Sequence, residues 1–346
     1  MESLATKYRP KTFDDVVGQE NVKHILQNQI DKKEVKQAYL FTGPAGTGKT
    51  TLARILASAI NGGKGQPIEV DGASNNGVDN VRAIIDDSKF KAMDCEWKVY
   101  IIDECHMLTT GAWNAMLKVL EEPPVKTIFM MCTTDPQKIP ATILSRVQRF
   151  DIKKHSTVNI VKRLQYILTM ENEEIMGKGG PDGFYNYEQD ALEYIAKLAE
   201  GGMRDAITML DKCCGYNENI TLENVVNALG SADYATFFKL TDEILAEHAD
   251  KCIEIIEGLY MDGKDLKQFA KLYSYFLLDI IKYKLLGNFD YISIPKLYAE
   301  DLDEYRDNET DFFKEVLQTF IELNVKIKWE SNVKPLIEAE VLMLCL

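Results

Sequence analysis

The segment Gly43–Thr50 (GPAGTGKT) is the feature that most constrains the fold of this chain. It follows an apolar run, Ala38–Thr42, and opens an amphipathic stretch near 49–60, so it joins a strand to a helix. Glycines at this spacing let backbone N–H groups wrap phosphates at a helix N-terminus, with Lys49 reaching the β- and γ-phosphates and Thr50 holding magnesium. A chance glycine-rich turn would lack this context. The predicted nucleotide-binding residues of the loop are Gly43, Pro44, Ala45, Gly46, Thr47, Gly48, Lys49, Thr50 and Thr51.

Short apolar runs alternate with amphipathic stretches over the first half of the chain. This alternation predicts a parallel sheet covered by helices on both faces. After about residue 153 the strand signal disappears and helical spacing dominates. We therefore expect an α/β domain at 1–153, a small helical domain at 154–230 and a larger helical domain at 231–346. The predicted strands are Ala38–Thr42, Ile68–Asp71, Lys98–Asp103, Thr127–Thr133 and Arg149–Asp151, with helices near 49–60, 77–89, 110–121 and 140–145.

Composition and charge exclude several classes of protein. The 346 residues are 46% hydrophobic and 27% charged, which is typical of a globular protein and not of a collagen-like or disordered one. No apolar run approaches the roughly 18 residues of a membrane span, and the first ten residues lack a signal-peptide core. Seven cysteines without a C-x-x-C pair suggest reduced core thiols. We expect a soluble, cytoplasmic protein without membrane association.

The net charge of −14 is carried almost entirely by residues 154–346, and residues 1–153 are nearly neutral. This acidic balance argues against diffuse binding of nucleic acid by the field of the whole chain. It leaves room for a local basic face on the first half.

An apolar strand, Val99–Ile102, ends in two carboxylates. Asp103 can coordinate magnesium, and Glu104 can orient or deprotonate an attacking water. About 50 residues after a phosphate-binding loop, this pair is a specific signal. His106 completes an Asp-Glu-Cys-His string that is similar to the helicase DEAD/DEAH box, but no further helicase motif accompanies it, so we interpret that match as superficial.

Hydrolysis of ATP also needs a cation near the γ-phosphoryl group. Two arginines are candidates, Arg146 after the segment Thr133–Pro136 and Arg204 at an expected helix start. Taken alone, each is more typical of a surface or salt-bridge arginine, and it is their order and spacing in the chain that favour a role in hydrolysis.

The order of these motifs resembles that of the ATPase subunits of sliding-clamp loaders in the AAA+ class. It is most similar to the gamma/tau subunits of the bacterial DNA polymerase III clamp loader and more distantly similar to replication factor C subunits. The similarity is dense over about 1–215 and looser beyond. The matching segments are Lys7–Phe13, Val17–Glu20, Gly43–Thr50, Asp103–His106, Asn114–Pro124, Thr133–Arg146 and Gly202–Asp211.

The resemblance implies a role for several single residues. Thr134 matches sensor 1, which reads the γ-phosphate, and Arg204 matches sensor 2, which reaches the nucleotide from the helical lid. Arg146 matches the arginine finger that acts on ATP bound to the adjacent subunit, although Val147 replaces the usual Cys. The residues that frame the base and ribose would be Tyr8, Arg9, Val17 and Gly18.

The resemblance also places a DNA contact on the stretch Asp71–Arg82, which lines the interior of the assembly in that family. Asn75, Asn76 and Gly77 precede a helix that carries Arg82, and such a helix start offers N–H groups and one cation to a phosphate. A plain N-capped helix remains the alternative. Lys89 and Lys91 are possible further phosphate contacts.

Two departures from the family pattern matter. Gamma/tau relatives carry a four-Cys zinc module after the first helix, whereas Asn61–Gly65 leads directly to the next strand here, so we expect no zinc. The chain also reaches Leu346 soon after its last predicted helices, without the long tail of the tau form.

The resemblance therefore implies an α/β P-loop (AAA+) domain with a parallel sheet, a helical lid at 154–230 and an all-helical collar at 231–346. It implies an ATP- and Mg²⁺-dependent motor subunit that opens a ring-shaped sliding clamp and loads it onto primer-template DNA. The partners would be other clamp-loader subunits, in a homo- or hetero-oligomer that family analogy makes a pentamer. Two alternatives are a non-hydrolysing scaffold subunit and an AAA+ branch-migration helicase.

Overall fold

The computed structural model describes residues 2–177, 184–229, 234–289, 291–292, 294–295 and 298–346. These residues form two compact units. The first contains the residues up to 177 together with Ile195–Asp211, and the second contains 184–194 together with Lys212–Leu346. The expected division at 153/154 remains a prediction, and the expected boundary at 230/231 lies outside the described residues.

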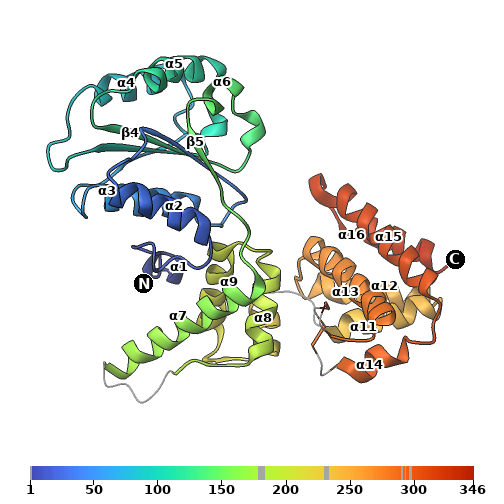
Figure 1. Cartoon of the computed structure of the whole chain (residues 1–346). Helices are drawn as coiled ribbons and strands as arrows, with labels where there is room; N and C mark the ends of the chain where they lie inside the picture. Colours follow the sequence, from blue (N-terminus) through green and yellow to red (C-terminus); the bar gives the residue numbers. More distant parts are fainter. Residues whose placement is uncertain (1, 178–183, 230–233, 290, 293, 296–297) are drawn as a thin grey trace. The chain divides into compact units, whose positions relative to one another are not determined.

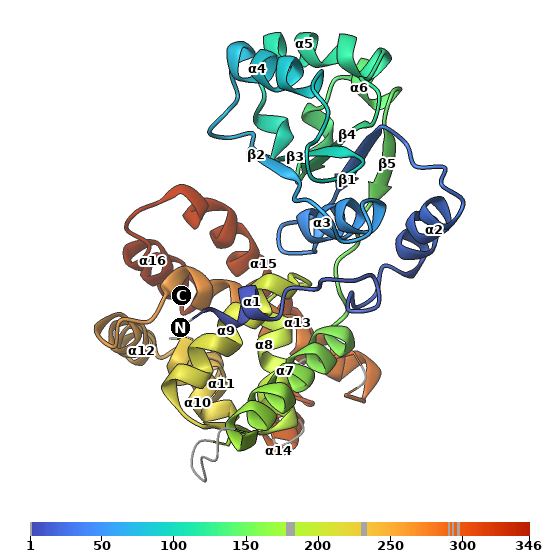
Figure 2. The same cartoon turned by 90° about the vertical axis from the view of Figure 1, so that its left-hand side faces the viewer.

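The first unit is built on a five-stranded, all-parallel sheet of order β2-β3-β4-β1-β5 (Figure 2). The strands in its middle are apolar except at their ends, because helices cover both faces and neither side of a strand faces water. The strands are β1 (Ala38–Thr42), β2 (Ile68–Asp71), β3 (Lys98–Asp103), β4 (Thr127–Thr133) and β5 (Gln148–Asp151). The predicted parallel sheet is confirmed.

Two apolar cores lie on opposite faces of this sheet, under the helices that Figure 1 shows on either side of it. Alternate residues of one strand serve each face: Phe41 of β1 packs into one core with Leu52, and Leu40 packs into the other with Trp113. One face carries α2 (Glu20–Asp31) and α3 (Lys49–Ile60), and the other carries α4 (Val78–Ser88), α5 (Thr110–Glu121) and α6 (Ala141–Leu144).

Helices that follow the sheet in sequence complete the first unit. They are α7 (Thr157–Gly177) and the start of α9 (Met203–Tyr216), while α8 (Gln189–Leu198) runs from one unit into the other. The short α1 (Leu4–Lys7) is tied to α7 because Lys7 Nζ lies 2.6 Å from Glu171 and 2.5 Å from Glu174. This anchoring fixes the path of Tyr8 and Arg9, which follow directly.

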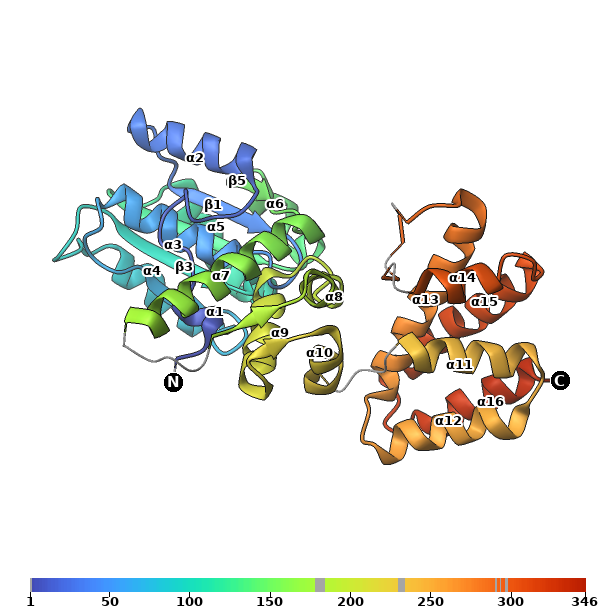
Figure 3. The ribbon, with the colours of Figure 1, turned by 90° about the horizontal axis from the view of Figure 1, so that it is seen from below.

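The second unit is mainly helical. Helix α12 packs against both α11 and α16 (Figure 3), and α13 packs on α15. Its core is aromatic: Tyr273 is fully buried, donates to or accepts from Thr241 at 2.8 Å, and meets the edge of Phe320. Its helices are α10 (Leu222–Leu229), α11 (Tyr234–Leu245), α12 (Ala249–Met261), α13 (Leu266–Leu286), α14 (Ala299–Glu304), α15 (Thr310–Lys326) and α16 (Lys334–Leu344).

The expectation that strands end near residue 153 was wrong in one detail. Strands β6 (Asn186–Tyr187) and β7 (Asn219–Ile220) pair in parallel. Each has only two residues, of which Ile220 alone is buried, so neither strand is long enough to leave a hydrophobic alternation in the sequence.

None of the helices in the described ranges is long and apolar enough to cross a membrane. All seven cysteines are free thiols, and five of them are buried. Burial raises the pKa of the Cys132 thiol well above its usual range, which makes this group chemically inert.

Gly43, which directly follows β1, gives a prediction about stability. Gly43 has φ +150°, and an added Cβ would lie 2.3 Å from the Ile152 carbonyl oxygen, whereas Gly62 has φ +59° and open space around it. We expect Gly62→Ala to lower the free energy of unfolding by about 1 kcal/mol through backbone strain alone, and Gly43→Ala by more than about 3 kcal/mol. Denaturant unfolding followed by Trp97 and Trp113 fluorescence, in a Trp329→Phe background, measures both. Equal losses for the two variants would contradict the steric argument.

Candidate nucleotide-binding site

Three loops meet at the carboxyl edge of the parallel sheet. Thr42 at the end of β1 is in register with Thr133 at the end of β4, and β3 ends beside them at Asp103. The loops that follow carry the glycine-rich segment, the carboxylate pair and Thr134. Because parallel strands present their carboxyl ends on one edge, residues about 90 positions apart in sequence become neighbours.

The glycine-rich loop turns by using backbone conformations that side chains disfavour. Gly46 and Gly48 have φ of +70° and +98°, and Gly48 is the N-cap of α3. The first turn of α3 contains no acidic residue, so its free N–H groups and the positive end of its dipole face the loop uncompensated. This is the arrangement that binds a phosphate.

Lys49 lies at the start of α3 and is buried, with 6% of its surface exposed. Its ammonium donates to the carbonyl oxygens of Gly43 at 3.0 Å and Pro44 at 2.8 Å. Burial lowers the pKa of Lys49, and the carboxylates of Glu104 and Asp103 offset part of that shift. A buried cation held only by neutral carbonyls is well suited to accept an anionic ligand.

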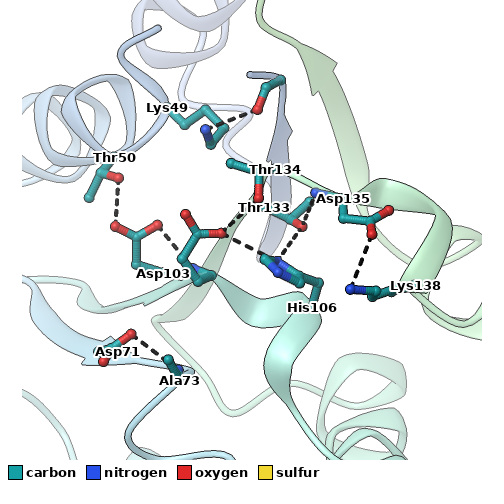
Figure 4. A network of polar contacts seen from close by, with 12 residues as sticks. Lys49, Thr50, Asp71, Ala73, Asp103, His106, Thr133, Thr134, Asp135 and Lys138 are labelled. Carbon is teal, nitrogen blue, oxygen red and sulfur yellow. Dashed lines mark hydrogen bonds and ion pairs between the residues drawn. The ribbon is translucent and has the colours of Figure 1, made fainter. Parts of the chain in front are cut away.

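A hydroxyl and a carboxylate lie side by side next to this lysine. Thr50 Oγ1 donates to Asp103 Oδ2 at 2.8 Å, and Asp103 Oδ1 accepts the Glu104 N–H at 3.0 Å (Figure 4). Both are hard oxygen ligands of the kind that Mg²⁺ prefers, and Mg²⁺ is commonly held by one or two protein oxygens together with substrate phosphates. Thr50 and Asp103 therefore fit the metal role predicted for them.

Glu104 is held in a strained conformation beside two polar neighbours. Its φ of +43° lies in the left-handed region, which costs a non-glycine residue about 1–2 kcal/mol. Its Oε2 accepts from Thr134 Oγ1 at 3.1 Å and lies 3.3 Å from His106 Nδ1. His106 Nδ1 is also 3.1 Å from Thr133 Oγ1, as Figure 4 shows. The structure therefore brings His106, which the motif comparison set aside, into the site.

A pocket of about 450 Å³ lies over these groups. Most of the predicted nucleotide residues line it, whereas Gly18, Gly43, Pro44 and Thr134 do not. The predicted residues that line it are Tyr8, Arg9, Val17, Ala45, Gly46, Thr47, Gly48, Lys49, Thr50, Thr51, Asp103, Glu104 and Arg204.

Several pocket residues were missed by the sequence analysis, and two of them, His155 and Arg163, make hydrogen bonds to the backbone of other pocket residues. His155 Nε2 donates to the Thr47 carbonyl oxygen at 3.2 Å, and burial lowers the pKa of His155, which favours the neutral ring. Arg163 on α7 donates to the Tyr8 carbonyl oxygen at 2.7 Å. Neither residue belongs to a local motif, since each reaches the pocket only through the packing of α7 and the segment before it.

The start of α9 packs directly on the glycine-rich loop. The Arg204 N–H donates to the Gly46 carbonyl oxygen at 3.2 Å, and an added Cβ on Gly46 would lie 3.1 Å from Asp205 Oδ2. The Arg204 side chain is exposed. The predicted sensor 2 residue is thus joined to the pocket of its own chain.

Arg146 is not among the residues that line this pocket. Its Nε and Nη2 donate to Glu121 Oε1 at 3.0 and 2.5 Å, and its Nη1 donates to the Thr142 carbonyl oxygen at 2.6 Å. The side chain is 31% exposed. Arg146 therefore lies outside the pocket of its own chain in this conformation, and its partial exposure is compatible with a role toward another subunit.

The predicted DNA-binding residues lie apart from the pocket, around the N-terminus of α4. Gly77 is the N-cap of α4 and provides no side-chain cap. Arg82 is exposed but lies 3.4 Å from the exposed Asp79 carboxylate. The Asn76 carbonyl oxygen accepts the Thr109 N–H, so the Asn75–Gly77 turn is fastened to the start of α5.

The sheet order, the glycine-rich loop and the carboxylate pair define a P-loop ATPase domain of the AAA+ class. The residues also match two family descriptions: "DNA polymerase III, delta subunit" over 18–77 and 66–156, and "DNA polymerase III clamp loader subunit, ATPase lid domain" over 183–217. A solved structure titled as the Thermotoga maritima RuvB Holliday junction branch migration motor has a TM-score of 0.51 at 22% identity, covering 85% of this chain and 97% of that one. That likeness shows the fold alone.

Curated relatives identify the family. DNA polymerase III subunit tau of Bacillus subtilis is 34% identical over 99% of this chain and 63% of its own length. DNA polymerase III subunit gamma of Buchnera aphidicola from Schizaphis graminum is 30% identical over 96% of this chain and 91% of its own length. The chain therefore belongs to the gamma/tau family of DNA polymerase III clamp-loader subunits. It spans less than two thirds of the Bacillus relative.

The buried lysine gives a direct test of nucleotide binding. Lys49→Ala removes the only charged donor in the described glycine-rich loop, and we expect the affinity for ATP to fall at least about 100-fold. Titration with a fluorescent ATP analogue measures this, with circular dichroism as a check of the fold. The matched control is Lys64→Ala, on the exposed 61–65 loop, which should bind as the unmodified chain does. Unchanged affinity in Lys49→Ala would contradict the assignment of the site.

Proposed function

We propose that this chain is an ATP-hydrolysing motor subunit of a sliding-clamp loader. The observation that carries the proposal is the convergence of Lys49, Thr50, Asp103, Glu104 and Thr134 at one edge of the sheet, with Arg204 packed against the same loop. A scaffold that binds nucleotide weakly would need none of these groups together. The names of the relatives, which are DNA polymerase III subunits, support the setting in replication.

In the proposed reaction the loop N–H groups and Lys49 bind the phosphates of ATP. Thr50 and Asp103 would hold magnesium, which neutralises phosphate charge when it is bound. Glu104 orients a water in line with the γ-phosphorus, and Thr134 donates to a γ-phosphate oxygen. Arg204 adds positive charge from the helical lid, so the lid position reports whether ATP is present.

Hydrolysis is completed in trans by Arg146 of an adjacent subunit. Support comes from its place outside the pocket and its partial exposure. To reach the neighbour's ATP, the Arg146 guanidinium has to leave Glu121. The γ-phosphate favours this move because it carries more negative charge than one carboxylate. Surface ion pairs of this kind contribute only about 0–1 kcal/mol, so the exchange costs little.

ATP favours the assembly that grips and opens a ring-shaped clamp, since a ligand shifts an equilibrium toward the state that binds it more tightly. The partners in this proposal are other subunits in a pentamer, the clamp, and primer-template DNA. The helical collar that we propose at 231–346, after the lid at 154–230, would hold subunits together. Release follows hydrolysis because ADP loses the contacts to Thr134 and Arg146.

DNA would be contacted through its phosphates at the start of α4. The N–H groups of this helix start lack a side-chain cap, and Arg82 is exposed. Asp79 reduces the net charge there, so the contact depends more on the backbone N–H groups of the helix start, from Asn76 and Gly77 onward, than on the arginine. The Asn75 N–H already donates to the Asp71 carbonyl oxygen at 3.0 Å, so Asn75 would contribute through its side chain.

We also propose that the protein works in the cytoplasm and without structural zinc. The loop after α3 is closed by a pair of hydrogen bonds, Asn61 Nδ2 to the Trp97 carbonyl oxygen at 2.9 Å and the Trp97 N–H to Asn61 Oδ1 at 2.8 Å. This pair connects α3 to the segment before β3, which makes a metal-held module unnecessary for closing the loop.

Steady-state ATP hydrolysis tests the proposal most directly. We expect turnover by the purified chain to rise strongly only when primed DNA and the ring clamp from the same genome are both present. Glu104→Gln should bind ATP yet hydrolyse it at least about 100-fold more slowly, because the water loses its orienting base. Glu122→Gln, an exposed carboxylate at the end of α5, is the matched control. Turnover that neither DNA nor clamp changes would overturn the clamp-loading function.

The trans role of Arg146 makes a separate prediction. Arg146→Ala and Lys49→Ala chains should each lose at least about 100-fold in hydrolysis, and an equal mixture should recover up to about a quarter of the unmodified rate. The recovery arises where a Lys49→Ala subunit supplies its arginine to a neighbour that holds ATP. Arg149→Ala, a nearby arginine paired with Asp151, serves as the control. If no mixture exceeds the two separate rates, Arg146 does not act in trans.

A further inference from the structure

His106 lies beside Glu104, the carboxylate that orients the water in the proposed reaction, although the predicted roles gave His106 no part in hydrolysis. Its Nδ1 is 3.3 Å from Glu104 Oε2 and 3.1 Å from Thr133 Oγ1, and the side chain is only 12% exposed. One short turn, the 3₁₀ segment Cys105–Met107, carries it, and Glu104 is the N-cap of that turn. The same backbone that strains Glu104 therefore also aims the imidazole at it.

A count of protons limits what Thr134 can do for Glu104. The threonine hydroxyl has one proton, which it donates to Glu104 Oε2 here. If Thr134 donates that proton to a γ-phosphate oxygen, as the proposed function requires, Glu104 loses this donor. Among the described residues, His106 is then the remaining side chain within reach that can donate to the carboxylate.

His106 can fill this role in one tautomer only. A carboxylate accepts and never donates, so the contact requires a proton on Nδ1. A lone pair on Nδ1 would face a lone pair of the Glu104 carboxylate oxygen at 3.3 Å, and the two would repel each other. An N–H on Nδ1 instead makes a charge-assisted hydrogen bond to that oxygen. Thr133 Oγ1 already accepts the Asp135 N–H at 3.0 Å and keeps a second lone pair toward the same Nδ1–H.

We propose that His106, protonated on Nδ1, is the positioning residue that holds Glu104 in place once Thr134 has turned to the γ-phosphate. The proposal rests on the proposed ATP hydrolysis and adds a residue to it. Glu104 needs such a support because its φ of +43° is strained and its side chain is 37% exposed, so an untethered carboxylate would sample other directions. His106 touches neither water nor phosphate and acts only through Glu104.

The tautomer can be read without any turnover. Nitrogen-15 NMR of the histidine rings in the full chain distinguishes Nδ1–H from Nε2–H, and with four histidines the His106 signals are the ones lost in His106→Asn. We expect Nδ1–H in the free protein, and the same tautomer after addition of a non-hydrolysable ATP analogue with magnesium. An Nε2–H ring in the analogue-bound protein would overturn the proposal, whatever the chain does with ATP.

Kinetics with three variants separate positioning from packing. The side-chain amide of Asn can place an N–H where Nδ1 lies, whereas that of Gln reaches the Nε2 position. We expect His106→Asn to keep kcat within about threefold, and His106→Gln and His106→Ala to lose at least about tenfold in kcat with KM for ATP nearly unchanged. Full activity in His106→Ala, or an Asn variant as slow as the Ala variant, would refute the role. An unmodified chain that fails to hydrolyse ATP refutes the proposed function instead, and the NMR result still decides the contact.

Discussion

The parallel register of β1, β3 and β4 is the constraint on which the site depends. It ends three strands at one edge and so brings together Lys49, Asp103 and Thr134 from loops far apart in sequence. The register is fixed by burial: each of these strands is covered on both faces, and a slip of one residue would exchange the side chains of the two cores. The apolar strands therefore do more than stabilise the fold, because they set the distances between the polar groups at their ends.

The same edge of the sheet gathers charged side chains in a partly buried place. Each of its donors therefore has an acceptor within the site. Lys49 donates to two loop carbonyls, Thr50 donates to Asp103, and Thr134 donates to Glu104. In the proposed reaction Lys49 and Thr134 turn to phosphate oxygens and Thr50 to magnesium. For Lys49 the binding of ATP would replace two neutral carbonyl acceptors by a charged phosphate, and charge-assisted hydrogen bonds are the stronger ones. The burial that lowers the pKa of Lys49 favours that exchange, since a phosphate stabilises its charged form.

Sequence patterns predicted the parts of this site that are local and missed those that depend on packing. The strand before Gly43 and the strand before Asp103 carry their own signals, and both were predicted within the bounds that the structure has. His155 and Arg163 reach the pocket from segments whose only pattern is helical, and β6 pairs with β7 through only two residues on each strand. His106 lies between these two cases. The sequence analysis noted it in the Asp-Glu-Cys-His segment, but its contact with Glu104 depends on the left-handed backbone of Glu104, which the residue type of Glu104 does not predict.

Arg146 shows why the proposed site is incomplete in one chain. Two loop carbonyls restrain Lys49 and a carboxylate restrains Thr50, yet the arginine is fastened to Glu121 and Thr142 on the far side of the same domain. In the proposed function, an isolated subunit with ATP bound would have a cradle, a magnesium site, an oriented carboxylate and the charges of Lys49 and Arg204, but it would lack the guanidinium that a neighbour brings to the γ-phosphoryl group. Supplying that guanidinium from a neighbour would make the rate depend on how subunits meet, and this dependence would couple hydrolysis to the proposed assembly with DNA and clamp.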